Sequence, residues 1–495
     1  MYRTFAQIDS VTNLLAAWFP QLFTRVQLPE TSVEGRPVYA LRMRVGDPGD
    51  RRAVLIVGGT HARELMNPDA IIEFAVDMLV SYTGGTAITY GGRVWPAENV
   101  KLVLEALDIW LVPCSNPDGR NYVMTVDDLW RKNRRDNVNS ACDGVDLNRN
   151  LDLLWGVAQG STSCSPCSDV YCGPSAFSEP ETRNIKHLLD TNRVVTFADV
   201  HSYSELVLHP WGHAPTQSTD PSQRFTGLAT GTCSASVPFG YKEYMDPRDL
   251  KRFVAVGNQI VADIAAVRGR TYIRQPGIDL YATTGTHSDY VYSRHIANPK
   301  HYKTYGFTFE TGPSVGDTRQ SFHPTDPTLI KIDAKAAMLS LLVESVCAIE
   351  LIGLPLFGGG GEMSAMRRIR DDLLASTEAG REWIALFERI QAPAIAVIRQ
   401  DQGLAEVAID LLRAAARLID DEQLVLDRAD AQRASAMLAA VIERSDSKEV
   451  DRDIEAIRRK LAQVAGKPVV RVIETLLRRR PDRRRVLSGD RAKRP

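Results

Sequence analysis

The sequence alternates predicted strands and predicted helices over residues 1–355, and this alternation constrains the fold more than any other feature. Short apolar and β-branched runs are separated by helical stretches and by loops rich in glycine and proline. The predicted strands cover residues 38–45, 53–57, 108–112, 194–200 and 306–309. The predicted helices cover residues 67–82, 180–192, 251–268 and 327–347. Strands that alternate with helices form a sheet with helices on its faces, so the pattern predicts an α/β fold.

A run of glycines ends this pattern. Residues 356–362 include four consecutive glycines and predict a flexible linker. Apolar residues then recur at helical spacing, so we expect residues 363–475 to form a small all-α domain, whose role the sequence leaves open. Residues 476–495 carry nine Lys and Arg residues against two Asp residues. Such a basic tail binds an anionic partner or stays solvated, and the lack of aromatic residues favours a solvated tail.

The overall charge argues against a chain-wide electrostatic partner. The chain has 60 Lys and Arg residues against 61 Asp and Glu residues, a net charge of −1, so we do not expect nucleic acid to bind. No apolar run reaches the ~18–20 residues of a membrane span. The N-terminus lacks the ordered basic and apolar regions of a signal peptide and predicts an amphipathic helix with Ser10 as its N-cap. The default expectation is therefore a cytoplasmic protein.

Four of the seven cysteines fall within residues 142–172, which complicates the choice of compartment. The spacing Cys164-x-x-Cys167 occurs in zinc knuckles and in redox motifs. A zinc site of four cysteines usually has two such pairs, and no strand–helix–strand pattern surrounds this one. We therefore favour a loop stapled by disulfides.

Candidate metal ligands and a candidate base stand at the ends of the predicted strands. His61 and Glu64 follow strand 53–57, and His201 follows strand 194–200. Two histidines and one carboxylate with an open fourth position make a catalytic zinc site, although a surface pair at a helix start explains His61 and Glu64 equally well by itself. Glu310 ends a β-rich run, where it is either a general base beside a metal or an edge-strand carboxylate.

Two arginines are candidates for binding anionic oxygens. Arg131 lies in the polar segment 116–135, and Arg149 lies in the segment GVDLNRN at 144–150. Guanidinium groups grip carboxylate or oxyanion oxygens with two parallel hydrogen bonds. Runs of arginine more often form solvated faces, but an Asn-Arg pair bracketed by apolar residues fits that explanation poorly.

Seven segments together resemble a known family. They are residues 61–64 (HARE), 116–119 (NPDG), 130–132 (WRK), 144–150 (GVDLNRN), 201–203 (HSY), 281–290 (YATTGTHSDY) and 307–310 (FTFE). Their order and approximate spacing are similar to those of the zinc metallocarboxypeptidases of the carboxypeptidase A/B type, over about residues 2–350. The resemblance implies a mixed central β-sheet flanked by helices. It also implies hydrolysis of C-terminal peptide bonds by zinc-activated water with a glutamate as general base.

The resemblance assigns roles residue by residue. It implies one Zn²⁺ ion held by His61, Glu64 and His201, with Asp146 orienting His61. It implies Glu310 as the general base and Arg131 as the group that stabilises the oxyanion. The implied substrate is a peptide or protein with a free C-terminal carboxylate. The residues implied to contact that substrate are Asn148, Arg149 and Tyr281 at the carboxylate, Arg63 along the wall and Tyr203 in an outer subsite.

The resemblance also bears on the cysteines. Cys142 and Cys167 match two positions that form a disulfide in the secreted animal members. Cys164 and Cys172 are then left to form a second bridge across the same loop. Disulfides favour an oxidising compartment, so an extracellular location stays open beside the cytoplasmic default.

The expected specificity pocket departs from the family. Ser288 stands where members specific for basic residues carry an aspartate and where members specific for apolar residues usually carry an apolar side chain, so it supports neither preference. Asp199 lies two residues before His201 on the same strand face. It either lines the pocket and favours C-terminal Lys or Arg, or makes a structural hydrogen bond. We expect His287 at the rim of the pocket or in a loop.

Two other functions stay open. The same chemistry on cell-wall peptides or glutamylated tails would need the same carboxylate-binding residues. A catalytically idle binding protein, with the helical region as its functional part, would have lost a ligand or the base. All of these residues are present in the sequence.

Overall fold

The computed structural model describes residues 2–46, 51–158, 160–214, 217–220, 222–223, 233, 242–346, 403, 406–407, 427–444 and 448–466. The chain divides into two compact units, one of residues 1–45 and 51–345 and the other of residues 46–50 and 346–495. The predicted boundary at residue 355, the linker 356–362 and the basic tail 476–495 lie outside the described residues, as does most of 363–475.

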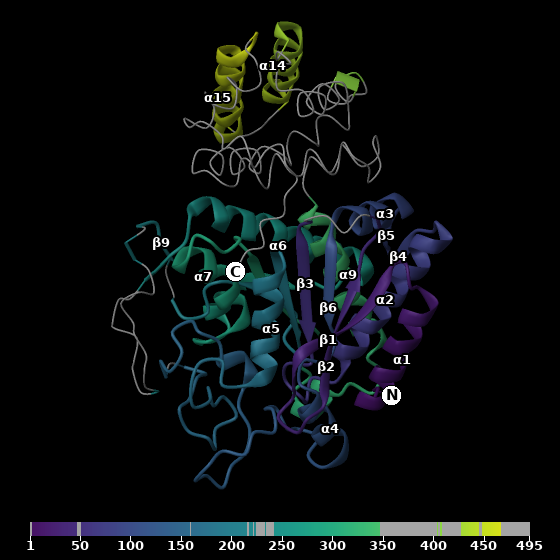
Figure 1. The fold of residues 1–495 in the computed structure, drawn as a ribbon, viewed down its shortest axis with the longest axis vertical. Coiled ribbons are helices and arrows are strands. Elements are labelled where there is room, and N and C mark those ends of the chain that lie inside the picture. Colours follow the sequence, from purple (N-terminus) through teal and green to yellow (C-terminus); the bar gives the residue numbers. More distant parts are fainter. Residues whose placement is uncertain are drawn as a thin grey trace. The chain divides into compact units, whose positions relative to one another are not determined.

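An eight-stranded mixed sheet forms the centre of the first unit (Figure 1). The strands lie in the order β1, β2, β6, β3, β7, β12, β8, β11. The block β6–β3–β7–β12 is parallel, whereas β2 and β8 run antiparallel to the strands of this block beside them. The bounds are β1 Phe23–Thr31, β2 Pro37–Met43, β3 Ala53–Gly58, β6 Asp108–Val112, β7 Val194–His201, β8 Leu206–His209, β11 Ile273–Pro276 and β12 Tyr305–Glu310. The predicted α/β fold with a mixed central sheet is confirmed.

The middle of the sheet is buried on both faces. Every residue of β3, β6 and β7 is buried, so helices must cover both sides of these strands. Two helices, α2 (Met66–Gly84) and α6 (Pro247–Arg268), pack against α9 (Thr328–Ser345), which also contacts β3 and β7. Two more helices contact the sheet elsewhere: α5 (Pro180–Thr191) at β1 and α7 (His287–Ala297) at β7 and β12.

Local sequence sets the helix ends. Helix α6 begins after Asp246, whose side chain accepts a hydrogen bond from the backbone N–H of Arg248, and it ends at Gly269 with φ of 74°. Helix α1 (Phe5–Trp18) begins after Thr4, which forms a capping box with Gln7. The predicted N-cap at Ser10 is therefore wrong. Ser10 lies inside α1 and its hydroxyl donates to the carbonyl of Ala6 at 2.8 Å.

The other described elements are shorter or belong to the second unit. In the first unit they are α3 Ala97–Ala106, α4 Pro117–Thr125, α8 Thr318–Phe322, β4 Ile88–Tyr90, β5 Arg93–Trp95, β9 Gln217–Ser218, β10 Glu243–Tyr244, and the 3₁₀ turns η1 Leu147–Arg149 and η3 Gly277–Asp279. The second unit contains α14 (Arg428–Glu443) and α15 (Lys448–Val464), which pack together and confirm the predicted helical character for those residues. Within the described ranges, no helix is both long and apolar enough to span a membrane.

Candidate functional site

The site lies where three parallel strands end. Strands β3, β7 and β12 are neighbours and run in the same direction, so their carboxyl ends meet at one edge of the sheet. His201 and Glu310 are the last residues of β7 and β12 and lie opposite each other in the register. The loop after β3 carries His61 and Glu64 to the same edge. Ligands bind at such strand ends in open α/β sheets.

The side chains of His61, Glu64 and His201 converge in the structure. The Nδ1 atom of His61 lies 2.7 Å from one carboxylate oxygen of Glu64, and the Nδ1 atom of His201 lies 3.0 Å from the other. The two Nδ1 atoms are 3.0 Å apart, and all three residues are buried. One potential ligand atom from each residue lies within 4.8 Å of the others. Two imidazoles and one carboxylate are the donor set of catalytic zinc sites, so these residues fit one zinc ion.

A second carboxylate lies behind each histidine ring. The Nε2 atom of His61 lies 3.2 Å from Asp146, and the Nε2 atom of His201 lies 2.8 Å from Asp199. A carboxylate at Nε2 holds the proton on that nitrogen and leaves the Nδ1 lone pair for a metal. Asp146 and Asp199 thus determine which ring nitrogen of each histidine carries the proton, although neither carboxylate lies at the metal position.

Asp199 is buried among supporting groups. Its side chain is fully buried and accepts a hydrogen bond from the hydroxyl of Thr60 at 3.0 Å. Its second oxygen faces both His201 and the Nδ1 atom of His287, which is 3.0 Å away. Of the two interpretations of Asp199, the structural one matches this geometry, because the carboxylate is already surrounded by its partners.

Asp146 connects the ligand His61 to an arginine and to the next turn of chain. The Nε and one terminal nitrogen of Arg131 donate to Asp146 at 3.0 and 2.9 Å. The other carboxylate oxygen accepts from the backbone N–H of Asn148 at 2.9 Å. Burial disfavours ionisation here, but Arg131 together with Arg149 and His61 holds the pKa of Asp146 well below its usual range. Asp146 is therefore an anion that fixes three functional groups at once.

A recess of about 440 Å³, its open mouth included, adjoins the metal-binding residues. One wall carries groups able to bind an anion or move a proton: His61, Arg131, Asn148, Arg149, Tyr281 and Glu310. The remaining lining is neutral and consists of Leu208, Gly212, Gly277, Leu280, Thr283, Thr286, Ser288 and Thr308. The lining thus contains a set of groups that can bind an anion or move a proton, called the anion-binding wall, and a set of uncharged residues, called the neutral wall.

The anion-binding wall is held by an interlocked pair of loops. Arg149 is buried, and its Nε atom donates to the carbonyl oxygen of Ser161 at 2.6 Å. The side-chain oxygen of Asn148 accepts from the backbone N–H of His287 at 2.8 Å. Since His287 follows the loop that starts at Tyr281, the second bond ties Asn148 to the end of that loop.

Glu310 lies on the recess and is partly exposed. Burial raises the pKa of its carboxyl to about 7, and repulsion from Glu64 acts in the same direction. The positive charges of His201 and Arg131 lower the pKa and only partly offset this rise. A carboxyl group with a pKa near neutrality can both accept and donate a proton. The structure thus places the predicted base beside the predicted ligands.

A family model described as zinc carboxypeptidase matches residues 8–338 of this chain. The chain belongs to the zinc carboxypeptidase family. Carboxypeptidase B of Helicoverpa zea is 35% identical over 244 residues, covering 48% of this chain and 52% of that protein. Carboxypeptidase A1 of Homo sapiens is 34% identical over 213 residues, covering 43% of this chain and 47% of that protein. The chain thus spans about half the length of the curated relatives that it matches.

Two solved structures share the fold over 70% of this chain. Carboxypeptidase A from Helicoverpa armigera aligns with a TM-score of 0.52 and 24% identity, covering 70% of this chain and 74% of that one. Bovine thrombin-activatable fibrinolysis inhibitor, solved in complex with a tick carboxypeptidase inhibitor, aligns with a TM-score of 0.53 and 23% identity, covering 70% and 98%. At these identities the likeness concerns the fold alone.

Arg63 and Tyr203, which were predicted to contact the substrate, are not among the residues that line the recess of this family member. A terminal nitrogen of Arg63 donates to the carbonyl of Leu129 at 3.2 Å, and the guanidinium lies over the ring of Phe322. The ring of Tyr203 packs edge-on against the same Phe322, with centroids 4.8 Å apart. Arg63 and Tyr203 therefore form one neighbouring surface through Phe322, and their contact with substrate stays a prediction.

Two residues that support the site of this family member were not predicted from the sequence. Thr60 precedes the ligand His61 directly, so its adjacency was a usable signal. His287 was expected at the pocket rim or in a loop. It instead begins α7, is buried, and lies between Asp199 and Asn148. No spacing in the sequence indicates this position, because the two residues beside it come from distant segments.

The disulfides differ in part from the expected pairs. Cys142 pairs with Cys167, as the resemblance implied, with an S–S distance of 2.06 Å. The pairing of Cys164 with Cys172, which the sequence left open, does not form, because Cys164 pairs with Cys233 at 2.08 Å. Cys172 is a buried free thiol. Cys172 lies near Cys164 in the sequence and beside the Cys164–Cys233 disulfide in the structure, so sequence spacing alone suggested it as a partner.

Proposed function

We propose that this chain is a metallocarboxypeptidase that removes single C-terminal residues from peptides or proteins. One observation carries the proposal. His61, which belongs to the cluster of zinc-type ligands, lines one recess together with Glu310 and the group Asn148, Arg149 and Tyr281. A metal centre, a proton-transfer group and an anion-binding wall in one recess match the hydrolysis of a peptide bond next to a free carboxylate.

The anion-binding wall selects the end of a chain. Arg149 contributes a fixed positive charge, and Asn148 and Tyr281 contribute neutral hydrogen-bond donors. A free α-carboxylate satisfies these groups, whereas an internal peptide bond offers no negative charge to them. This difference favours an exopeptidase that releases one residue at a time.

His61, Glu64 and His201 would hold the zinc ion. When bound, zinc acts as a Lewis acid at the carbonyl to be cleaved and lowers the pKa of water. Arg131 faces the same recess and can donate to the oxygen on which negative charge develops. Its ion pair with Asp146 keeps the guanidinium oriented before substrate arrives.

Glu310 supplies the proton transfers. Its carboxylate accepts the proton of the attacking water, and the resulting acid gives that proton to the leaving amine. Burial raises the pKa of this carboxyl above the usual range of a glutamate, which supports its use as both acceptor and donor of the proton. The partial exposure of Glu310 gives water access to it from the recess.

The neutral wall supports a preference for uncharged C-terminal residues. Ser288, Thr283, Thr286 and Thr308 bring hydroxyl groups to this wall, and no acidic side chain apart from Glu310 lines the recess among the described residues. A C-terminal Lys or Arg would therefore bury its charge without a counter-ion, which is unfavourable. Small polar and medium apolar residues fit this lining better.

A peptide library with diverse C-termini tests the proposal. We expect zinc-loaded full-length protein to trim each accepted peptide by one residue, with neutral residues released faster than Lys, Arg, Asp or Glu. Peptides with amidated C-termini should not react, because the carboxylate is gone. A zinc chelator should stop the reaction and added zinc should restore it. Trimming of no peptide, or equal trimming of amidated peptides, would contradict the proposal.

We also propose that the protein works in an oxidising compartment. The disulfides Cys142–Cys167 and Cys164–Cys233 support this location, because cytosolic thiols are kept reduced. Alkylation of the protein in intact cells, followed by mass spectrometry, would test it. Alkylated Cys142 and Cys167 would contradict the proposed location.

A further inference from the structure

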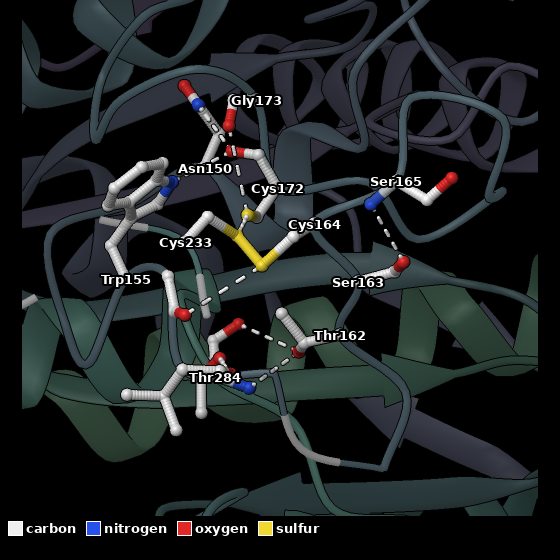
Figure 2. The surroundings of a disulfide bond; sticks show 12 residues. Asn150, Trp155, Thr162, Ser163, Cys164, Ser165, Cys172, Gly173, Cys233 and Thr284 are labelled. Carbon is white, nitrogen blue, oxygen red and sulfur yellow. Dashed lines mark hydrogen bonds between the residues drawn. A yellow bond between two sulfur atoms is a disulfide. The ribbon is translucent and has the colours of Figure 1, made fainter. Parts of the chain in front are cut away.

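Three cysteine side chains, Cys164, Cys172 and Cys233, lie together (Figure 2) and form a group separate from the candidate metal ligands. Cys164 and Cys233 form a disulfide, and the Sγ atom of Cys172 lies 3.0 Å from the Sγ atom of Cys233. Cys172 is fully buried, whereas the two bonded cysteines are half-buried. The sulfur of Cys233 therefore has one bonded partner and a second thiol in direct contact.

We propose that these residues form a thiol–disulfide exchange site, in which Cys233 alternates between Cys164 and Cys172 as its partner. The thiolate of Cys172 attacks the Sγ atom of Cys233. The Cys172–Cys233 bond forms while the Cys164–Cys233 bond breaks, and Cys164 leaves as a thiolate that takes up the proton released by Cys172. One disulfide and one thiol are present before and after, so no external oxidant or reductant is needed.

Burial of Cys172 sets the resting state of the exchange site. Burial raises the pKa of the Cys172 thiol to about 11, Asp146 raises it further, and Arg149 opposes both. At neutral pH the thiol is therefore protonated, and the Cys164–Cys233 bond persists. The thiolate fraction grows about tenfold for each pH unit below the pKa, so the exchange should become faster in alkaline solution.

The chain before Cys164 links the exchange site to the recess. The backbone N–H of Ser161 donates to the carbonyl of Ala282 at 2.7 Å, and the hydroxyl of Thr162 accepts from the backbone N–H of Thr284 at 3.0 Å. This segment thus supports the loop that follows Tyr281. The carbonyl of Ser161 also accepts from Arg149, as described above.

Cys172 is anchored independently of its sulfur. Its carbonyl oxygen accepts from the indole of Trp155 at 2.8 Å and from the side chain of Asn150 at 2.9 Å. Exchange would therefore leave Cys172 in place and remove the covalent anchor of the segment that ends at Cys164. We expect this change to weaken the carboxylate grip, a consequence that rests on the proposed function, whereas the exchange itself does not.

Disulfide mapping of the full-length protein tests the exchange. Samples held at about pH 7 and about pH 9 are quenched with acid, unfolded, alkylated with N-ethylmaleimide and mapped by mass spectrometry. At the lower pH we expect Cys172 to be alkylated. At the higher pH we expect a fraction with alkylated Cys164 and a cross-linked Cys172–Cys233 peptide, while Cys142–Cys167 stays unchanged. Absence of the cross-linked peptide at both pH values would overturn the proposal.

A matched pair of variants gives a second test. Cys164→Ser, folded in a mixture of oxidised and reduced glutathione, should contain the Cys172–Cys233 disulfide. Cys172→Ser should keep Cys233 paired with Cys164. A folded Cys164→Ser protein in which Cys172 and Cys233 are both alkylated would overturn the exchange. If Cys164→Ser does not fold, the wild-type mapping decides the question.

Kinetics separate the exchange from its effect on the recess. With peptides that the wild type accepts, Cys164→Ser should have a KM raised several-fold and a kcat near the wild-type value, whereas Cys172→Ser should match the wild type. Equal KM values in all three proteins would overturn the link to the carboxylate grip. A wild-type protein that exchanges its disulfide but cleaves no peptide would instead contradict the proposed function alone.

Discussion

Asp199 illustrates how one residue can hold several parts of the site. Its two oxygens lie against Thr60, His201 and His287, and the side chain has no exposed surface. His287 in turn contacts Asn148 in the anion-binding wall. A single buried carboxylate thus orients the candidate metal ligand His201 and, through His287, supports Asn148, which is predicted to bind the substrate carboxylate.

Replacement of Asp199 tests this positioning role. We expect Asp199→Asn to weaken zinc binding about 10–100-fold, because residues behind a metal ligand typically have effects of this size. Zinc affinity is measured by competition with a chromophoric chelator, without reference to activity. The order in which C-terminal residues are released should stay the same. A selective loss of Lys and Arg release would instead return Asp199 to the specificity pocket.

Replacement of Glu310 tests the proton-transfer step. We expect Glu310→Gln to lower kcat by about 10²–10⁴-fold, the usual contribution of a positioned acid–base group. Gln keeps the size of the side chain but cannot accept the proton. Zinc content and the KM for an accepted peptide should change little, which separates lost chemistry from lost binding. A variant with near-normal kcat would remove Glu310 from the mechanism.

The sequence allowed the zinc-type ligands to be predicted, but not the roles of their neighbours. His201 ends an apolar strand, and His61 and Glu64 directly follow one, so strand ends alone bring them to one edge of the sheet. Asp199 shares a strand face with His201, and that fact fits a pocket residue as well as a supporting one. The supporting role of Asp199 is favoured by its contact with His287, which lies nearly ninety residues further along the sequence.

At the scale of elements, the loop before α7 packs directly on η1. Gly285 has φ of 68°, and a Cβ atom built on it would lie 2.3 Å from the carbonyl oxygen of Arg149. The backbone N–H of Leu151 donates to the carbonyl of Gly285 at 3.2 Å. A side chain at this position would push η1, and with it Arg149, out of place.

Substitution of Gly285 tests this contact. We expect Gly285→Ala to raise the KM for accepted peptides several-fold, because the carboxylate-binding Arg149 shifts. The matched control is Gly269→Ala, since Gly269 also has a positive φ, of 74°, but no atom lies within 4 Å of its added Cβ. Both variants should lose about 1 kcal/mol of stability from the left-handed backbone. Equal KM values in the two variants would contradict the packing argument.

Two buried glutamates lie at the start of α5: Glu179 is the N-cap residue and Glu181 lies in the first turn. Glu179 pairs with Arg135 at 3.0 Å, whereas Glu181 accepts only from neutral groups, the side chain of Asn133 at 3.2 Å and the backbone N–H of Val33 at 3.4 Å. Burial, with repulsion from Glu179, raises the pKa of Glu181 to about 8. Glu181 is therefore protonated in the folded protein at neutral pH.

This raised pKa predicts a pH dependence of stability. An unfolded glutamate has a pKa of about 4.3, so between that value and the folded value the folded protein holds a proton that the unfolded chain has lost. The stabilisation is complete below the unfolded pKa and declines as pH rises toward about 8. Glu181→Gln should make the decline of the free energy of unfolding with pH less steep, by up to about 1.4 kcal/mol per pH unit. Urea unfolding at several pH values measures this slope. An unchanged slope would contradict the assignment.

Strand prediction succeeded in the core and failed at the edges. The buried strand β3 is entirely apolar except for its final glycine, which makes it unmistakable in the sequence. Strands β1 and β11 were not predicted, because β1 buries only two of its nine residues and β11 is short, has no buried residue and ends in Pro276. Strand β8 has four residues, too few to show a period. Edge strands are defined by their partners, which the sequence alone does not reveal.

At the scale of the whole molecule, the catalytic parts all belong to the first unit. The eight-stranded sheet and every residue of the site lie between residues 23 and 310. The family model ends at residue 338, and the first unit ends at Ser345. The order of motifs in the sequence predicts a catalytic domain in this region. The sequence does not predict a role for the helical region. Helical periodicity indicates how side chains pack and does not identify catalytic side chains.

This division predicts that a shortened chain keeps the activity. A protein that ends at Val346 retains all eight strands, the zinc-type ligands and the recess. We expect it to unfold in one cooperative thermal transition and to show the kcat/KM of the full-length protein on the same peptides. Calorimetry and the peptide assay check these two points separately. Loss of the cooperative transition would show that residues 347–495 stabilise the catalytic unit. A cooperative, zinc-binding but inactive protein would show that those residues contribute to catalysis or substrate binding.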